Sequence, residues 1–182
     1  MRSGDLYLLE YDEQWPVLYT EISEEIRSFC KERIQLHHVG STAIPGLCAK
    51  PIIDILLELE GPDLDSLVAP FERAGYIYRE EYNKLMPFRR FFKKVNGEGT
   101  LAHIHCVLQG HNFIRRHLMF RDYLRLNPDR SREYCLMKRK LVQSGIERKN
   151  YPGAKTEFIR ETVREAYYFF HGEYPSESLW SD

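Results

Sequence analysis

Apolar residues in the first half of the chain recur with helical spacing in some segments and form short continuous runs in others. A helix is predicted over about residues 15–33, where apolar residues recur at intervals of four and three: Leu18, Ile22, Ile26 and Phe29. The apolar run at about 50–59 predicts a buried strand that ends before Gly61-Pro62. Asp63 is expected to cap a short helix that passes through Phe71 and closes near Gly75.

The remaining pattern predicts a hairpin followed by helices. Strands are expected at about 76–79, 88–95 and 101–108, with a hairpin turn at Asn96-Gly97. Three helices are then expected, at about 113–126, 132–144 and 155–171. The fold class predicted from this order is α/β (α+β), with a mixed, mostly antiparallel sheet, helices packed on it and a helical C-terminal half.

Length and composition predict one domain over residues 1–182. Its sheet-bearing half covers about 1–110, and its helical half covers about 111–172. A loose tail is expected over about 173–182, in which Trp180 could dock. Hydrophobic residues make up 43% and charged residues 29% of the chain, as in ordinary globular proteins. No run approaches the roughly 20 apolar residues of a membrane span, and residues 1–5 lack the apolar core of a signal peptide. Four scattered cysteines are expected to be reduced, so we predict a cytoplasmic protein that does not engage a membrane.

The small net charge of −1 hides an uneven distribution along the chain. Residues 111–149 contain eleven Lys and Arg against four Asp and Glu, and the other residues have an acidic excess. Such a basic region can attract anionic ligands, although a solvated pair of helices would have the same composition. The isoelectric point of about 6.7 argues against a dedicated nucleic-acid-binding protein.

The segment from His37 to Asp54 contains the most informative pattern in the chain. A small turn, Gly40-Ser41-Thr42, leads through a prolyl bend into an apolar strand that carries Asp54. Burying an unpaired carboxylate costs several kcal/mol, so Asp54 needs a partner such as a metal ion or a phosphate-bound cation.

This segment resembles the signature of the GrpB-like family, whose fold belongs to the polymerase-beta-type nucleotidyltransferases. Further segments match that family in order, and the resemblance covers roughly residues 7–170: residues 11–16, 103–105, 120–125, 134–138 and 151–158. The resemblance implies a nucleotidyltransferase-like fold in which a Gly-Ser turn holds a nucleoside triphosphate. It also implies that carboxylates on the next strand hold Mg²⁺.

The strand that carries Asp54 departs from the superfamily pattern. Alternate residues of a strand share a face, so Asp54, Leu56 and Glu58 are expected on one face and Ile53, Ile55 and Leu57 in the core. The superfamily has a second carboxylate two residues after the first, where this chain has Leu56. Glu58 lies about 13 Å farther along the strand, too far to share a metal with Asp54. Nucleotidyl transfer by two metals therefore lacks a ligand.

Two histidines suggest a different chemistry. His103 and His105 share a face of their strand, and if that strand lies beside Asp54, two imidazoles and a carboxylate would converge. This set binds transition metals, so Asp54, His103 and His105 are candidate catalytic residues and candidate ligands for Mg²⁺, Mn²⁺ or Zn²⁺. The alternative is a pair of histidines that only hydrogen-bond within a polar pocket.

Phosphate binding is predicted at the glycine turn and in the basic half. Gly40 lets backbone N–H groups approach a phosphate, Ser41 and Thr42 offer hydroxyls, and Lys50 offers a cation, although Lys50 could instead only neutralise Asp54. Either Arg89 or Arg90 could add a cation, and we favour Arg90. The basic half is expected to contribute four further residues: Arg121, Arg125, Lys138 and Lys155.

Three hypotheses for function follow. The first is a nucleotidyltransferase-like enzyme that transfers a nucleotide with a divalent metal. The second is a non-catalytic or accessory module of that fold that binds a nucleotide or phosphorylated metabolite. The third is a metal-dependent enzyme that uses Asp54, His103 and His105. The missing carboxylate at Leu56 favours the second and third, whereas the Gly-Ser turn favours the first two.

Overall fold

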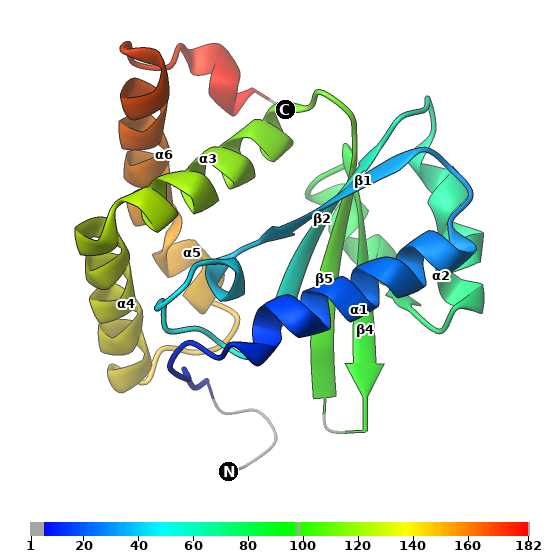
Figure 1. Ribbon diagram of the computed structural model, residues 1–182, viewed down its shortest axis with the longest axis horizontal. Coiled ribbons are helices and arrows are strands. Elements are labelled where there is room, and N and C mark those ends of the chain that lie inside the picture. The colour runs from blue at the N-terminus through cyan, green and yellow to red at the C-terminus, as the bar shows by residue number, and fades with distance from the viewer. Residues whose placement is uncertain (1–5, 98, 182) are drawn as a thin grey trace.

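The computed structural model describes residues 6–97 and 99–181, and a five-stranded sheet lies at its centre (Figure 1). The strand order is β1-β2-β5-β4-β3. Strands β2 and β5 are parallel, and the other neighbouring pairs are antiparallel. The predicted mixed, mostly antiparallel sheet is therefore confirmed. The strand bounds are β1 Ile34–Val39, β2 Ile53–Leu59, β3 Ile77–Tyr78, β4 Arg89–Asn96 and β5 Gly99–Leu108.

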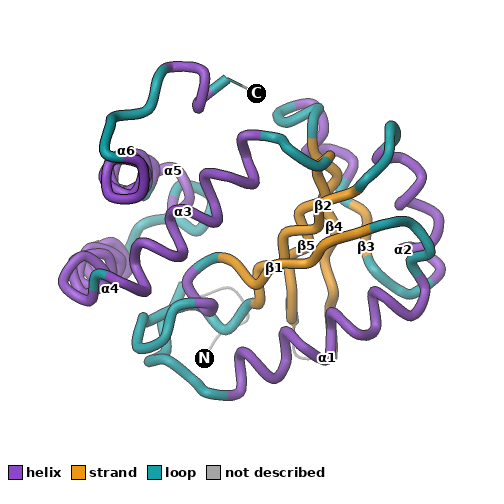
Figure 2. The backbone as a smooth tube through the Cα atoms, turned by 45° about the horizontal axis from the view of Figure 1, so that its top comes forward, coloured by secondary structure: helices purple, strands orange, loops and turns teal. Residues whose placement is uncertain are grey.

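Helices pack in two groups. Figures 1 and 2 show α3 to α6 gathered on one side of the molecule, with the strands between them and α2. The α-helices are α1 Gln14–Phe29, α2 Val68–Arg73, α3 Asn112–Leu126, α4 Pro128–Gln143, α5 Tyr151–Ala154 and α6 Thr156–His171. Short 3-10 turns are η1 Ser41–Ala43, η2 Leu64–Leu67, η3 Glu80–Lys84 and η4 Glu177–Trp180.

Two boundaries differ from the predicted ones for local reasons. The first helix ends at Phe29 because Cys30 is extended and Ile34–Val39 forms β1, a strand that the sequence pattern had not predicted. Helix α4 begins at Pro128, four residues before the predicted start. Proline is favoured in the first turn of a helix, where its missing N–H has no intrahelical partner.

The two faces of β2 have different roles, as strand alternation predicts. Ile53, Ile55 and Leu57 are buried in the main core, together with apolar residues of α1 and α2. On the other face, Leu56 packs in a smaller cluster with Val39, Val107 and the start of α3. Because α3 covers only this part of the face, Asp54 remains partly exposed beside it.

The segment after the glycine turn joins the sheet to the helical half. Ile44 and Leu47 are buried among apolar residues of α3, α4 and α6. The turn therefore cannot move freely relative to the helices, because its apolar residues form part of their core.

A disulfide also connects this segment to α4, which corrects the expectation that all four cysteines are reduced. Cys48 and Cys135 are bonded, with Cα atoms 5.6 Å apart, a separation that a disulfide spans. They lie 87 positions apart in sequence, so their spacing gave no sign of the contact. Cys30 and Cys106 are free and buried.

The expected loose tail is also corrected in part. Leu179 of η4 is buried, and Arg116 donates a hydrogen bond of 2.7 Å to its carbonyl. The expectations for residues 1–5 and for the last residue of the tail lie outside the described residues. Among the described helices, none combines the length and the apolar character needed to cross a membrane.

Candidate functional site

Asp54, His103 and His105 lie together on the face of the sheet opposite the main core. The parallel pairing of β2 with β5 sets Asp54 opposite His103 and Leu56 opposite His105. His103 Nδ1 lies 3.2 Å from Asp54 Oδ1, and His105 Nε2 lies 3.9 Å from the same oxygen. About a third of the Asp54 side chain is exposed, and the imidazoles are 26% and 18% exposed, so a ligand can reach this group. We call these three residues the Asp54 site.

Gly40 is required because its backbone lies directly on the Asp54 carboxylate. A Cβ at Gly40 would collide with Asp54 Oδ2. The φ and ψ angles of Gly40 are 72° and −171°, a combination that is essentially limited to glycine. The Gly-Ser turn and the carboxylate therefore form one tightly packed unit, with Ser41 beginning the short turn η1.

The Thr42 hydroxyl, by contrast, points into the protein, which corrects its prediction as a phosphate ligand. Thr42 is buried, and its Oγ1 lies 3.0 Å from His38 Nε2 and 3.5 Å from the Ile52 carbonyl oxygen. These contacts close the loop on itself, so the hydroxyl is not presented to a ligand.

Three predicted lysines come together from separate parts of the chain, and we call Lys50, Lys138 and Lys155 the lysine cluster. The Nζ atoms of Lys50 and Lys155 lie 4.2 Å and 4.6 Å from the ring centroid of Tyr151. Lys138 is 1% exposed, and its Nζ donates hydrogen bonds to Ser41 Oγ, at 3.0 Å, and to the Cys48 carbonyl oxygen. The cluster thus adjoins the glycine turn.

Burial lowers the pKa of each of these ammonium groups because it removes water from the charged form. The pKa of Lys138 falls to about 6, mainly through burial and then through the charge of Lys155. The pKa of Lys50 falls to about 8, again mainly through burial and then through neighbouring cations. Burial also lowers the pKa of Lys155, while the Asp54 carboxylate opposes this change.

The Asp54 carboxyl responds in the opposite direction to its neighbours. Burial raises its pKa, but the hydrogen bond from His103 and the nearby imidazole of His105 together outweigh burial and hold the pKa well below its usual range. Asp54 is therefore ionised at neutral pH. Among the described residues its ion-pair partners are these two histidines and not Lys50, so the alternative in which Lys50 only neutralises Asp54 is not the observed arrangement.

Arg121 and Arg125, which are predicted as part of a phosphate-binding wall, form hydrogen bonds to the glycine loop. Arg125 donates from Nε and Nη2 to the Ala43 carbonyl oxygen, at 3.0 and 2.8 Å. Arg121 donates to the His38 carbonyl oxygen at 3.0 Å and pairs with the Asp122 carboxylate. Their donors are thus directed at backbone and carboxylate oxygens.

From the sequence, Arg90 is favoured as a further cation at the site. The structure instead places Arg89, the other arginine at the start of β4, beside it. Arg90 is opposite Cys106, on the face of the main core, and its Nε bonds to Asp65. Arg89 lies on the other face, buried, with Nη1 2.9 Å from His105 Nδ1. Sequence alternation shows that the two face opposite ways, but not which of them faces Asp54.

Two further side chains lie on the same face of the sheet as Asp54 and were not predicted from the sequence. Lys93 is opposite His103, and burial lowers its pKa, followed by the charges of Arg79 and Arg148. His117 of α3 lies beside His105, with ring centroids 6.4 Å apart. Only the pairing of β4 with β5, and the start of α3 over the sheet, brings these groups near the site. Neither contact has a local sequence signal.

The predicted metal set does not fit the observed contacts. Within residues 6–97 and 99–181, no group of three or more His, Cys, Asp or Glu side chains is arranged to hold a metal ion. Because an arginine can only donate, His105 Nδ1 must accept from Arg89, and its proton is then on Nε2. Neither nitrogen of His105 presents a free lone pair toward Asp54, so the two-histidine, one-carboxylate set is not assembled.

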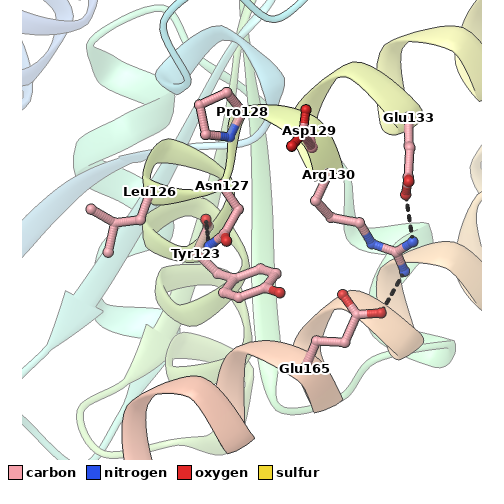
Figure 3. A pocket seen from close by; sticks show the side chains of 8 residues that line it. All are labelled: Tyr123, Leu126, Asn127, Pro128, Asp129, Arg130, Glu133 and Glu165. Carbon is pink, nitrogen blue, oxygen red and sulfur yellow. Dashed lines mark hydrogen bonds and ion pairs between the residues drawn. The ribbon is translucent and has the colours of Figure 1, made fainter.

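Two pockets lie away from the Asp54 site, one in the helical half and one between the helical half and the segment after the glycine turn. One of about 350 Å³ is at the corner between α3 and α4, where Arg130 lies between Glu133, at 2.8 Å, and Glu165, at 3.1 Å (Figure 3). The other, of about 420 Å³, is lined in part by Arg125 and Cys135. Because the arginine of the first pocket is already held by carboxylates, it is a poor anion site.

This chain is similar to a known protein family in both sequence and structure. A family model described as GrpB protein matches residues 5–165. A UPF0157 protein of Halalkalibacterium halodurans is 37% identical over 167 residues, covering 90% of this chain and 84% of that protein. The glutamate-rich protein GrpB of Alkalihalophilus pseudofirmus is 30% identical and is covered over 98% of its length. The crystal structure of the conserved protein GrpB from Enterococcus faecalis superposes with a TM-score of 0.80 at 33% identity, covering 90% of this chain and 99% of that one.

Proposed function

This chain belongs to the GrpB protein family, and we propose that it binds the phosphate part of a nucleotide or other phosphorylated small molecule beside Asp54. In this proposal the phosphate lies between the Gly40-Ser41 turn and the lysine cluster. The lysines supply positive charge, and the turn supplies a hydroxyl and backbone N–H groups.

The observation that carries the proposal is that the lysine cluster has no anionic partner among the described residues. The ammonium groups of Lys50, Lys138 and Lys155 contact two tyrosine rings, one hydroxyl and one carbonyl oxygen. No described carboxylate lies within ion-pair distance of any of them. Buried lysines ordinarily have an acidic partner, so an anion that binds there would pair with Lys50 and Lys155 and would restore the charge of Lys138.

Binding of a phosphate should change the protonation of the lysine cluster. The pKa values of Lys50 and Lys138, about 8 and about 6, are lowered by burial and by neighbouring cations. A bound phosphate favours the charged form of each lysine and must raise these pKa values. At pH 7.5 the protein should therefore take up protons when a phosphate ligand binds, and the affinity should fall as the pH rises further.

The test is calorimetric titration with inorganic pyrophosphate at pH 7.5 in two buffers of different ionisation enthalpy. A difference between the two apparent enthalpies that corresponds to proton uptake is expected. Lys155→Met should weaken binding about tenfold, which corresponds to about 1.4 kcal/mol, and should reduce the dependence on salt. The matched control is Lys149→Met, because Lys149 is exposed and pairs with Glu147. Pyrophosphate binding without proton uptake, or equal effects of the two variants, would contradict the proposal.

Leu56 makes phosphate binding a better supported function than nucleotidyl transfer by two metals. At the position of the second carboxylate, Leu56 is 0% exposed and packs with Val39 and Val107. A carboxylate could not replace it without losing these contacts and being buried. Strand β2 thus offers one metal-binding carboxylate, and any transfer reaction needs other groups of the site.

A further inference from the structure

The contacts of His103 determine which of its nitrogens carries the proton. Its Nδ1 lies 3.2 Å from Asp54 Oδ1. The pKa of Asp54 is held well below its usual range by these histidines, against the effect of burial, so the carboxyl is ionised and can only accept. His103 Nδ1 must therefore donate. In the neutral ring this leaves a lone pair on Nε2, the arrangement of a base oriented by a carboxylate.

His105 must be in the opposite tautomer. Arg89 Nη1 lies 2.9 Å from His105 Nδ1, and a guanidinium has no lone pair to offer. His105 Nδ1 is therefore the acceptor, and its Nε2 carries the proton. The pKa of His105 is lowered, mainly by burial, so the ring is neutral. Its Nε2 lies 3.9 Å from Asp54 Oδ1, beyond hydrogen-bond distance, so this N–H remains available to a ligand.

We propose that His103 and His105 are a proton acceptor and a hydrogen-bond donor for chemistry on the phosphate ligand, and not ligands of a metal. Asp54 and Arg89 are positioning residues, because each acts by fixing the tautomer of one imidazole. This inference rests on the proposed function, since it needs a phosphate held beside the lysine cluster. It deepens that function by assigning a reaction class, phosphoryl or nucleotidyl transfer to a hydroxyl group or water.

The proposed reaction is an attack on a phosphoric anhydride in which His103 accepts the proton. The oxygen of a hydroxyl or water attacks phosphorus in a phosphoric anhydride, and a new O–P bond forms. The P–O bond to the leaving phosphate breaks, and its electron pair stays on the leaving oxygen. The proton of the attacking oxygen passes to Nε2 of His103, while His105 Nε2–H donates to a phosphoryl oxygen. The lysine cluster neutralises the leaving phosphate.

The location of Arg89 supports a positioning role. Its side chain is buried, with the guanidinium over the rings of Phe91 and Phe113 at 5.1 and 5.9 Å from their centroids. Packing between these rings restricts the guanidinium, so its donor to His105 Nδ1 is held in place. A methionine at this position would keep most of the apolar contact and lose the donor.

The first test is ¹⁵N NMR of histidine-labelled protein without ligand or metal, with assignment by His103→Gln and His105→Gln. The expected tautomers are Nδ1–H for His103 and Nε2–H for His105. Arg89→Met should convert His105 to a mixture of tautomers and leave His103 unchanged. Equimolar Zn²⁺ should leave both tautomers as they are. His103 protonated at Nε2, or loss of the His105 Nε2 proton on addition of Zn²⁺, would overturn the inference.

The second test measures whether Nε2 of His103 faces the ligand. Diethyl pyrocarbonate acylates unprotonated imidazole nitrogens, and peptide mass spectrometry locates the modified residue. Modification of His103 should slow at least fivefold in saturating pyrophosphate, while His171, on the exposed end of α6, should react at an unchanged rate. Unprotected His103 with pyrophosphate bound would overturn this inference alone. Failure of pyrophosphate to bind in calorimetry would instead overturn the proposed function, and the proton-transfer step with it.

Discussion

Replacing Lys138 by methionine should change how the stability of the protein depends on pH. Lys138 is 1% exposed, and its pKa falls from 10.5 to about 6, mainly through burial and then through the charge of Lys155. Between these two values the unfolded chain binds a proton at Lys138 that the folded protein does not bind. Because stability rises with pH wherever the unfolded state binds more protons, this lysine should make the protein more stable as the pH rises from 6 to 10.5.

The size of this effect follows from the one proton involved. A difference of one bound proton changes the free energy of unfolding by about 1.4 kcal/mol per pH unit. From pH 7 to pH 9 the wild-type protein should therefore gain about 2.7 kcal/mol relative to Lys138→Met. The variant also loses the hydrogen bonds to Ser41 and the Cys48 carbonyl, but that loss shifts its stability equally at each pH.

The assay is urea unfolding at pH 7, 8 and 9 of the wild type, Lys138→Met and the exposed control Lys149→Met. The difference between wild type and Lys138→Met should grow with pH, whereas the wild type and the control should remain parallel. A constant difference between wild type and Lys138→Met would refute the reasoning, because it would mean that Lys138 keeps its proton in the folded protein.

Three further predictions concern the support of the site. Gly40→Ala should lower the free energy of unfolding by about 3 kcal/mol in urea titrations. An alanine there would have a strained backbone conformation, and its Cβ would also collide with the Asp54 carboxylate. Gly46→Ala, with open space around its Cβ, should cost only about 1 kcal/mol; equal losses would contradict this account. Cys135→Ser should cost about 2–4 kcal/mol without reductant, and the loss should disappear when the wild type is compared in reductant. Arg125→Met should weaken pyrophosphate binding in calorimetry without changing its salt dependence, and a reduced salt dependence would mean that Arg125 contacts the phosphate itself.

Strand alternation was sufficient to predict which residues of β2 face the core. Ile55 and Leu57 are fully buried against α1 and α2, and Asp54 lies on the other face. The same rule placed His103 and His105 on one face of their strand. It could not show that this strand is the parallel neighbour of β2, because strand pairing depends on contacts between distant parts of the chain.

Side chains in the glycine loop could not be assigned in the same way. Ser41 and Thr42 are adjacent hydroxyl residues, yet Ser41 accepts from Lys138 whereas Thr42 bonds within the loop. A loop has no fixed periodicity, so sequence position does not determine the direction of its side chains. The disulfide was missed for a related reason, since the contact between Cys48 and α4 exists only once the helices are packed.

The predicted arginines and lysines have different roles, and the difference follows from the chemistry of their side chains. Arginine has five donors in a rigid fork, so Arg125 can place two of them on one carbonyl oxygen and thereby hold the turn. Lysine is a compact charge on a flexible stem, and its pKa shifts readily when it is buried. Lys138 shows this shift strongly, whereas the guanidinium of Arg121 donates a hydrogen bond to a backbone carbonyl oxygen. Arginines therefore fix the shape of the turn, and the lysines are left as the groups whose charge an anion would restore.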